Sequence, residues 1–502
     1  MKILSLQVAG AVLKSMVGLI VLAALGLCCS NALAQTTDAI TAGPRVRVTQ
    51  AVDEHQMVSL PGRVNPNAKP SNDRGLVSDA QPITRMHLSL QRSAEQQAAL
   101  SQLIADQQNK NSANYHAWLT PQAFGKQFGP ADADVATLTN WLASHGFQNI
   151  KVSTGKTAVE FSGTVGQVRS AFRTEIHNYV VNGEEHFANV SVPQVPAALA
   201  PIIAGMPALH NFHSKPMLHR VGKFRKNMAT GVTQPLFTFT DVNGTFFGLG
   251  PADFAKIYNA PSGFTGAGVN IAIVGRSNIN IQDVRDFRTM FGLPANDPQI
   301  ILNGADPGLI SGDEGEADLD VEWSGAVAPG ATIKFVATQT TETDAVDGVF
   351  ASAFFIVNNN IADILSQSFG SCEANSDNTD QNLLWEQAAA QGITVVVAAG
   401  DNGANPKLQI GFQNVVMGIE DDAAGLRPAK NLRREAGVGA ADLDGFDFGI
   451  SFGLNLDLHR HAEEVEVLFH PAVEAKAGFR AIDGIGGVEF GDSGGINPLS
   501  EK

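Results

Sequence analysis

The chain contains very little cysteine. Three of its 502 residues are cysteines, and two of them, Cys28 and Cys29, lie in an apolar N-terminal segment. If that segment is removed, Cys372 is left alone and cannot form a disulfide within the chain. Residues 404–502 also lack threonine and hold only three serines, which are Ser451, Ser493 and Ser500. Any catalytic motif that requires a threonine is therefore excluded from this stretch.

Positive charge is scarce as well. The chain has 34 Lys and Arg against 50 Asp and Glu, which gives a formal net charge of −16. This balance argues against non-specific binding of nucleic acid. A content of 44% hydrophobic and 17% charged residues is typical of a globular protein, and 502 residues are enough for two or three domains.

Residues 1–34 have the layout of a signal peptide. Two lysines precede an apolar run from Met16 to Cys29, and Ala32-Leu33-Ala34 supplies the small residues of a cleavage site before Gln35. A membrane anchor is the alternative, but the run is short for a spanning helix. We expect a secreted or periplasmic protein that has no membrane association once the signal peptide is removed.

The remaining chain divides by pattern into four regions. These are an α+β region at 77–212, a linker at 213–245 that is basic at first, an α/β region at 246–403 and a divergent tail at 404–502. In the α/β region five apolar segments, VNIAIVG, PQIIL, TIKFVA, ADILSQS and TVVVAA, alternate with helical patterns. This alternation predicts a doubly wound parallel sheet that is covered on both faces. In the tail, alternation in FDFGISFGLNLDL and EVEVLF suggests antiparallel strands.

Three acidic residues are the candidate functional groups. Glu316 and Asp320 are four residues apart in GEADLDVEWSGAVAPGA, so on a helix they share one face. Asp401 follows TVVVAAG, which places it at the carboxyl edge of the predicted sheet, where α/β proteins build their sites. The alternatives are a solvated acidic helix face for the first two and a simple turn residue for Asp401.

Five motifs follow one another along the chain: YHAWLTPQAFGKQFGP, GPADFAKIYN, GEADLDVEWSGAVAPGA, LSQSFGSCE and AAGDNGA. In this order they resemble those of the sedolisin or kumamolisin-like serine-carboxyl peptidases, which are made as proenzymes. The resemblance runs from about residue 77 to residue 403. It implies a subtilisin-like catalytic domain, of which 246–403 is a part. It also implies an α+β, ferredoxin-like activation prodomain at 77–212, with a processing site in the linker.

The resemblance also implies roles for individual residues. Glu316 would be the general base that takes the serine proton, Asp320 the acid that orients it, and Asp401 a protonated donor to the oxyanion. Ser368, Phe369 and Gly370 would form the substrate-binding strand. Polypeptides would be the substrates, the chain's own prodomain an intramolecular inhibitor, and calcium a cofactor. A glutamate base requires a pKa near the working pH, so the implied activity is shifted to acid.

The tail departs from the family pattern. Members carry their nucleophile in a GTSxSxP motif beyond the oxyanion Asp, and a tail without threonine cannot contain it. No counterpart of the family's calcium site is recognisable either. Three interpretations stay open: a peptidase whose nucleophile is not located, a pseudopeptidase or peptide-binding protein without catalysis, and a frameshifted or recombined product that leaves the family near Ala404.

Two further strings in the tail are similar to known motifs. Residues 491–495 read GDSGG, the string around the nucleophile of chymotrypsin-like peptidases, but no histidine lies in the setting that such a triad needs. HRHAEE at 459–464 is not a HExxH motif, so we expect no metal site there.

Overall fold

The computed structural model describes residues 44–216, 236–241, 244–261, 263–371, 377–398, 460–461 and 464–465. Within these ranges, side chains are described outside 236–249 and the two short tail segments. The N-terminal signal sequence, Asp401, Cys372 and Ser493 lie outside the described residues, so the predictions made for them stay predictions. No helix in the described part of the chain is long and apolar enough to cross a membrane.

The N-terminal region is built on a four-stranded antiparallel sheet with the strand order β4-β5-β3-β9. Helices lie between the first and second strands of this sheet and between the third and fourth, which with this strand order is the ferredoxin-like arrangement that was predicted. The elements are β3 (Pro82–Leu90), α2 (Ala94–Gln107), α3 (Pro121–Phe128), α4 (Asp132–Ser144), β4 (Gln148–Val152), β5 (Ala158–Thr164), α5 (Val165–Phe172), η1 (Ala200–Ile202) and β9 (Ile203–Gly205).

Local sequence signals fix the helix starts in this region. Ser93 caps α2 and Thr164 caps α5, each in a capping box with the glutamine three residues further on. Apolar side chains of α5, such as Val168 and Phe172, pack with Phe161 and other sheet residues in one core. Leu100 of α2 lies in a separate apolar cluster with Phe124 and Phe128. Smaller strands complete the region: β1 (Met57–Ser59) with β8 (Gln194–Pro196), and β2 (Asp73–Leu76) with β6 (Ile176–Val181) and β7 (Glu184–Asn189).

The C-terminal region contains a five-stranded parallel sheet, as predicted, with the order β14-β15-β13-β16-β18. The strands are β13 (Asn270–Gly275), β14 (Gln299–Leu302), β15 (Thr332–Ala337), β16 (Ile364–Gln367) and β18 (Thr394–Val397). Because successive residues of a strand point to opposite faces, Ile271 and Ile273 pack on one face while Ala272 and Val274 pack on the other.

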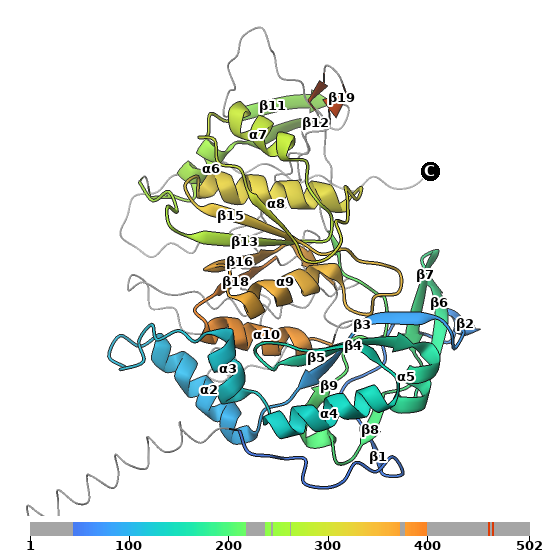
Figure 1. The fold of residues 1–502 in the computed structure, drawn as a ribbon. Helices are drawn as coiled ribbons and strands as arrows, with labels where there is room; N and C mark the ends of the chain where they lie inside the picture. Colours follow the sequence, from blue (N-terminus) through green and yellow to red (C-terminus); the bar gives the residue numbers. More distant parts are fainter. Residues whose placement is uncertain are drawn as a thin grey trace, which may run out of the picture.

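Helices cover both faces of this sheet (Figure 1). On one face lie α7 (Ile281–Met290) and α8 (Asp313–Val327), and on the other lie α9 (Gly348–Asn359) and α10 (Thr379–Ala390). These two layers confirm the doubly wound α/β prediction. A short helix, α6 (Pro251–Ile257), contacts α8.

The two regions pack against each other through α10, which lies between the parallel sheet and helices α2 and α3 (Figure 1). Ala390 of α10 joins a small apolar cluster with Leu100 and Phe124 of the N-terminal region. A backbone hydrogen bond adds to this contact: the N–H of Leu119 donates to the carbonyl of Ala390 at 2.9 Å.

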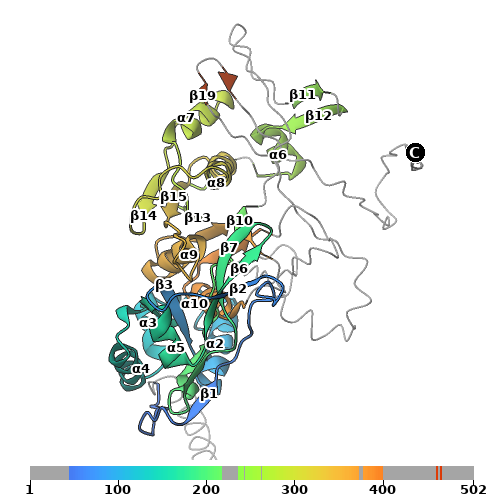
Figure 2. The same cartoon turned by 90° about the vertical axis from the view of Figure 1, so that its right-hand side faces the viewer.

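Two strands join the regions near the predicted linker. β10 (Lys215–Pro216) pairs antiparallel with β17 (Phe369–Gly370), so the end of the N-terminal region runs along a strand of the C-terminal region (Figure 2). An antiparallel hairpin, β11 (Leu236–Asp241) with β12 (Gly244–Leu249), begins in the stretch predicted as a linker and extends past its predicted end at residue 245; the sequence did not predict this hairpin. In the tail, β19 (Arg460–His461) pairs with β20 (Glu464–Val465).

Candidate active site

Glu316 and Asp320 lie on α8, the helix expected to carry them. Acidic side chains in the first turn favour a helix start because they interact with its positive N-terminal dipole. The residue before the helix, Gly312, has φ +94°, a conformation that glycine adopts without strain. Pro329 follows the end of the helix and prevents its continuation. Glu316 is buried, with 5% of its surface exposed, which does not fit a solvated acidic face.

Asp320 is linked to the predicted substrate strand by a direct hydrogen bond. The hydroxyl of Ser368 donates to Oδ1 of Asp320 at 2.6 Å. The other oxygen, Oδ2, is buried and has no hydrogen-bond partner among the described residues. Burial raises the pKa of Asp320 to about 7, although the bond from Ser368 opposes the shift by stabilising the charged form. This carboxyl group therefore holds its proton in acid and can pass it on near neutrality.

The predicted substrate strand is occupied on one side by the chain's own N-terminal region. Gly370 is paired with Lys215, and Phe369 is paired with Pro216. The ring of Phe369 is 1% exposed and lies in the core beneath the strand. The backbone of β17, rather than the Phe369 side chain, is therefore the part that meets a neighbouring peptide.

An arginine that sequence reasoning missed lies beside this strand. Arg276 follows β13 at the carboxyl edge of the sheet, and its guanidinium lies 5.3 Å from the ring centroid of Phe369. Nε and Nη2 donate to the two oxygens of Asp313 at 2.8 and 3.1 Å, which ties the start of α8 to the sheet. A charged residue directly after a parallel strand was the signal in the sequence that could have identified it.

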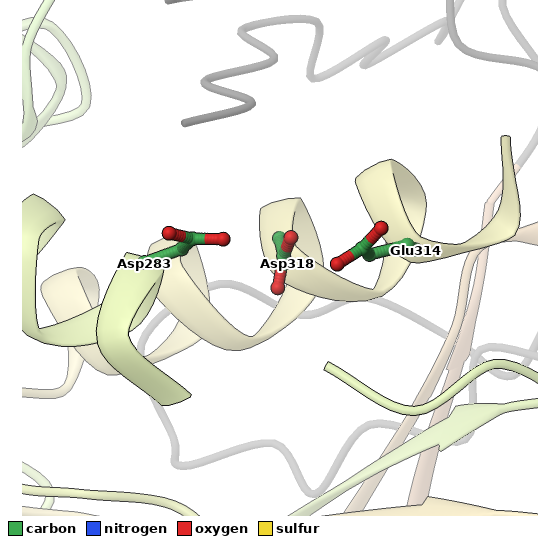
Figure 3. Close-up of side chains that lie close together, drawn as sticks. All are labelled: Asp283, Glu314 and Asp318. Atoms are coloured by element: carbon green, nitrogen blue, oxygen red, sulfur yellow. The ribbon is translucent and has the colours of Figure 1, made fainter. Parts of the chain in front are cut away.

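A second group of carboxylates lies on another face of α8. Asp283 of α7 and Glu314 and Asp318 of α8 are all buried, and one oxygen from each lies within 4.8 Å of the others (Figure 3). The resemblance would draw calcium ligands from the C-terminal part of the chain, so this group does not fit the implied calcium site and no ion is assigned to it.

Comparisons with known proteins agree with the motifs. Residues 69–212 match the family described as "Pro-kumamolisin, activation domain". Sedolisin of Pseudomonas sp. (strain 101) is 30% identical over 330 residues, which are 63% of this chain and 54% of sedolisin. Kumamolisin of Bacillus sp. (strain MN-32) is 25% identical, over 72% of this chain and 65% of kumamolisin.

A solved structure was also found. It is "Pseudomonas sedolisin (serine-carboxyl proteinase) complexed with two molecules of pseudo-iodotyrostatin", with 28% identity and a TM-score of 0.28 over 32% of this chain and 46% of that chain. The chain spans about half the length of the first curated relatives it matches, 54% of sedolisin and 42% of xanthomonalisin. The match to the activation-domain family and the matches to sedolisin and kumamolisin confirm the predicted resemblance to sedolisin-type peptidase precursors.

Proposed function

We propose that the chain is an exported proenzyme of the serine-carboxyl endopeptidase type that hydrolyses polypeptides in acid. The observation that carries this proposal is the hydrogen bond from Ser368 to the half-buried Asp320. It joins the acidic helix α8 to the strand that would bind substrate. The prodomain would extend over 77–212 and the partial catalytic domain over 246–403, with processing in the intervening linker.

The proposed chemistry assigns one task to each carboxyl group. Glu316 takes the proton of the nucleophile as general base, and Asp320 orients it through a shared proton. A carboxyl group with a pKa near 7 is protonated in acid, so Asp320 donates a hydrogen bond to an ionised neighbour under those conditions. Asp401, protonated, donates to the oxyanion of the tetrahedral intermediate. The nucleophile itself is not assigned, because the tail lacks the Thr-Ser motif of the family.

The pairing of β10 with β17 supports the role of the prodomain as an intramolecular inhibitor. A peptide substrate would add to the edge of β17 through backbone hydrogen bonds. Lys215 and Pro216 occupy that edge. They belong to residues 211–216, the end of the prodomain and the start of the linker, which we call the prodomain tail. Substrate and prodomain tail therefore compete for the same backbone groups, and cleavage of the linker beyond Pro216 would allow the prodomain tail to leave and open the strand. Calcium has no step in this scheme.

The test is peptide hydrolysis at about pH 4, where a glutamate base is near its ordinary pKa. We expect Glu316→Gln to abolish turnover, because an amide accepts no proton from the nucleophile. Glu185→Gln is the matched control, since Glu185 is exposed on β7 of the prodomain. Loss of activity in Glu316→Gln alone supports the peptidase.

A second candidate function is a pseudopeptidase that binds peptides without cutting them. It is favoured by the absence of threonine from 404–502, which removes the family's nucleophile motif. Equal, near-zero rates for the unmodified chain and for Glu316→Gln would support this binding role and contradict the enzyme.

A further inference from the structure

The prodomain tail makes its most specific contacts at Ser214, one residue before β10. The backbone N–H of Ser214 donates to Oδ2 of Asp347 at 2.9 Å, and its hydroxyl donates to the same oxygen. Its carbonyl accepts a hydrogen bond from Nη1 of Arg276 at 2.7 Å. Both backbone groups and the side chain of a single residue are therefore bound by two charged side chains.

These two side chains are held in place by other partners. Asp347 is the N-cap of α9, and its Oδ1 accepts from the N–H of Val349 at 2.9 Å. Arg276 is fixed by Asp313 and by the ring of Phe369. The side chains of Arg276 and Asp347 are each 12% exposed and lie 3.4 Å apart. Each of the two side chains therefore has partners other than Ser214, and these contacts preorganise the site for an occupant.

We propose that Arg276 and Asp347 form a subsite that binds the backbone of one residue of a polypeptide and selects a serine or threonine there. This inference rests on the proposed function, because the substrate would replace the prodomain tail in the same direction along β17. The selected residue of the substrate lies directly before the two that pair with Phe369 and Gly370, as Ser214 does in the tail.

The charges explain the selection. Oδ2 of Asp347 accepts from a hydroxyl, which serine and threonine provide and alanine does not. An aspartate or glutamate at this position would bring a second negative charge against Asp347. A hydrogen bond to a charged acceptor contributes enough binding free energy to change affinity about tenfold.

The first test uses the prodomain tail, residues 211–216, as the ligand within the full chain. Hydrogen exchange of residues 211–216 reports how often the tail leaves the subsite. We expect about tenfold faster exchange in Ser214→Ala and less than about threefold faster exchange in Ser214→Thr. In an Asp347→Asn background, Ser214→Ala should increase the exchange rate less than about twofold, because the hydroxyl has lost its charged acceptor. Asp132→Asn, at an exposed residue of α4, is the control background.

The second test places the ligand in trans. Labelled hexapeptides Asn-Phe-His-Ser-Lys-Pro and Asn-Phe-His-Ala-Lys-Pro, blocked at both ends, are titrated onto the Ser214→Ala chain, and fluorescence anisotropy is recorded. The serine peptide should bind about tenfold more tightly. Equal affinities of the two peptides would overturn the proposal. It would also be overturned if Ser214→Ala changed the exchange rate equally in the Asp347→Asn and Asp132→Asn backgrounds. Neither test measures hydrolysis. The subsite can therefore be confirmed or refuted even if the chain proves to have no peptidase activity.

Discussion

His87 of β3 is the residue whose replacement tests the packing of the two regions most directly. It is 1% exposed and lies between two carboxylates from different regions: Nε2 is 3.6 Å from Glu160 of β5, and Nδ1 is 3.4 Å from Asp380 of α10. The hydroxyl of Ser89 also donates to Asp380. The ring of Phe354 packs on the imidazole with centroids 5.1 Å apart. This arrangement forms a buried charged contact across the junction.

The contribution of protonated His87 to the free energy of unfolding follows from its pKa. Burial opposes its protonation, but Asp380 and Glu160 outweigh burial and raise the pKa from 6.5 to about 9. At roughly 1.4 kcal/mol for each pH unit, the shift corresponds to about 3 kcal/mol of stability. Because the folded-state pKa is raised, this contribution is fully present below pH 6.5 and is lost as the pH rises through about 9.

We expect His87→Gln to lower the free energy of unfolding by about 3 kcal/mol at about pH 6, where the imidazolium is replaced by a neutral amide. At about pH 9.5 the histidine is mostly neutral as well, so the difference from the unmodified chain should nearly vanish. Urea unfolding followed by circular dichroism measures both values. His55→Gln, at an exposed residue near the start of the described chain, is the control. A loss of stability that is equal at the two pH values would refute the reasoning, because it would indicate lost packing rather than lost charge.

Two further substitutions test other contacts. Ser368→Ala should raise the pKa of Asp320 above about 7, since the hydroxyl stabilises the charged carboxylate; carbon-13 NMR titration of labelled aspartate measures it, and an unchanged or lower value would contradict the assigned hydrogen bond. Gly155→Ala should destabilise the chain by about 1–3 kcal/mol, because its new Cβ would lie 2.1 Å from Oε1 of the fully buried Gln387. Thermal unfolding measures this loss, and an unchanged melting temperature would show that Gln387 moves aside freely.

Much of the local structure was determined by the sequence. The runs TIKFVA and TVVVAA predicted buried parallel strands because strands covered on both faces are mostly apolar along their length. The spacing of Glu316 and Asp320 placed them on one face of a helix, and α8 forms over that stretch. The hairpin at 236–249 was missed because its residues follow a basic stretch without a clear period.

Only the tertiary structure determined which distant residues meet. Ser368 reaches Asp320 across 48 positions of sequence. The burial of this carboxyl group in the folded chain raises its pKa, and the bond from Ser368 opposes that shift. Ser214, Arg276 and Asp347 come from three separate segments, so no local sequence pattern predicts their contact. Hydrophobic periodicity is set by neighbours along one helix or strand, whereas hydrogen bonds between elements depend on sheet order and helix packing. The sequence therefore determined the elements and the acidic pair, and the packing of the two regions determined the contacts around them.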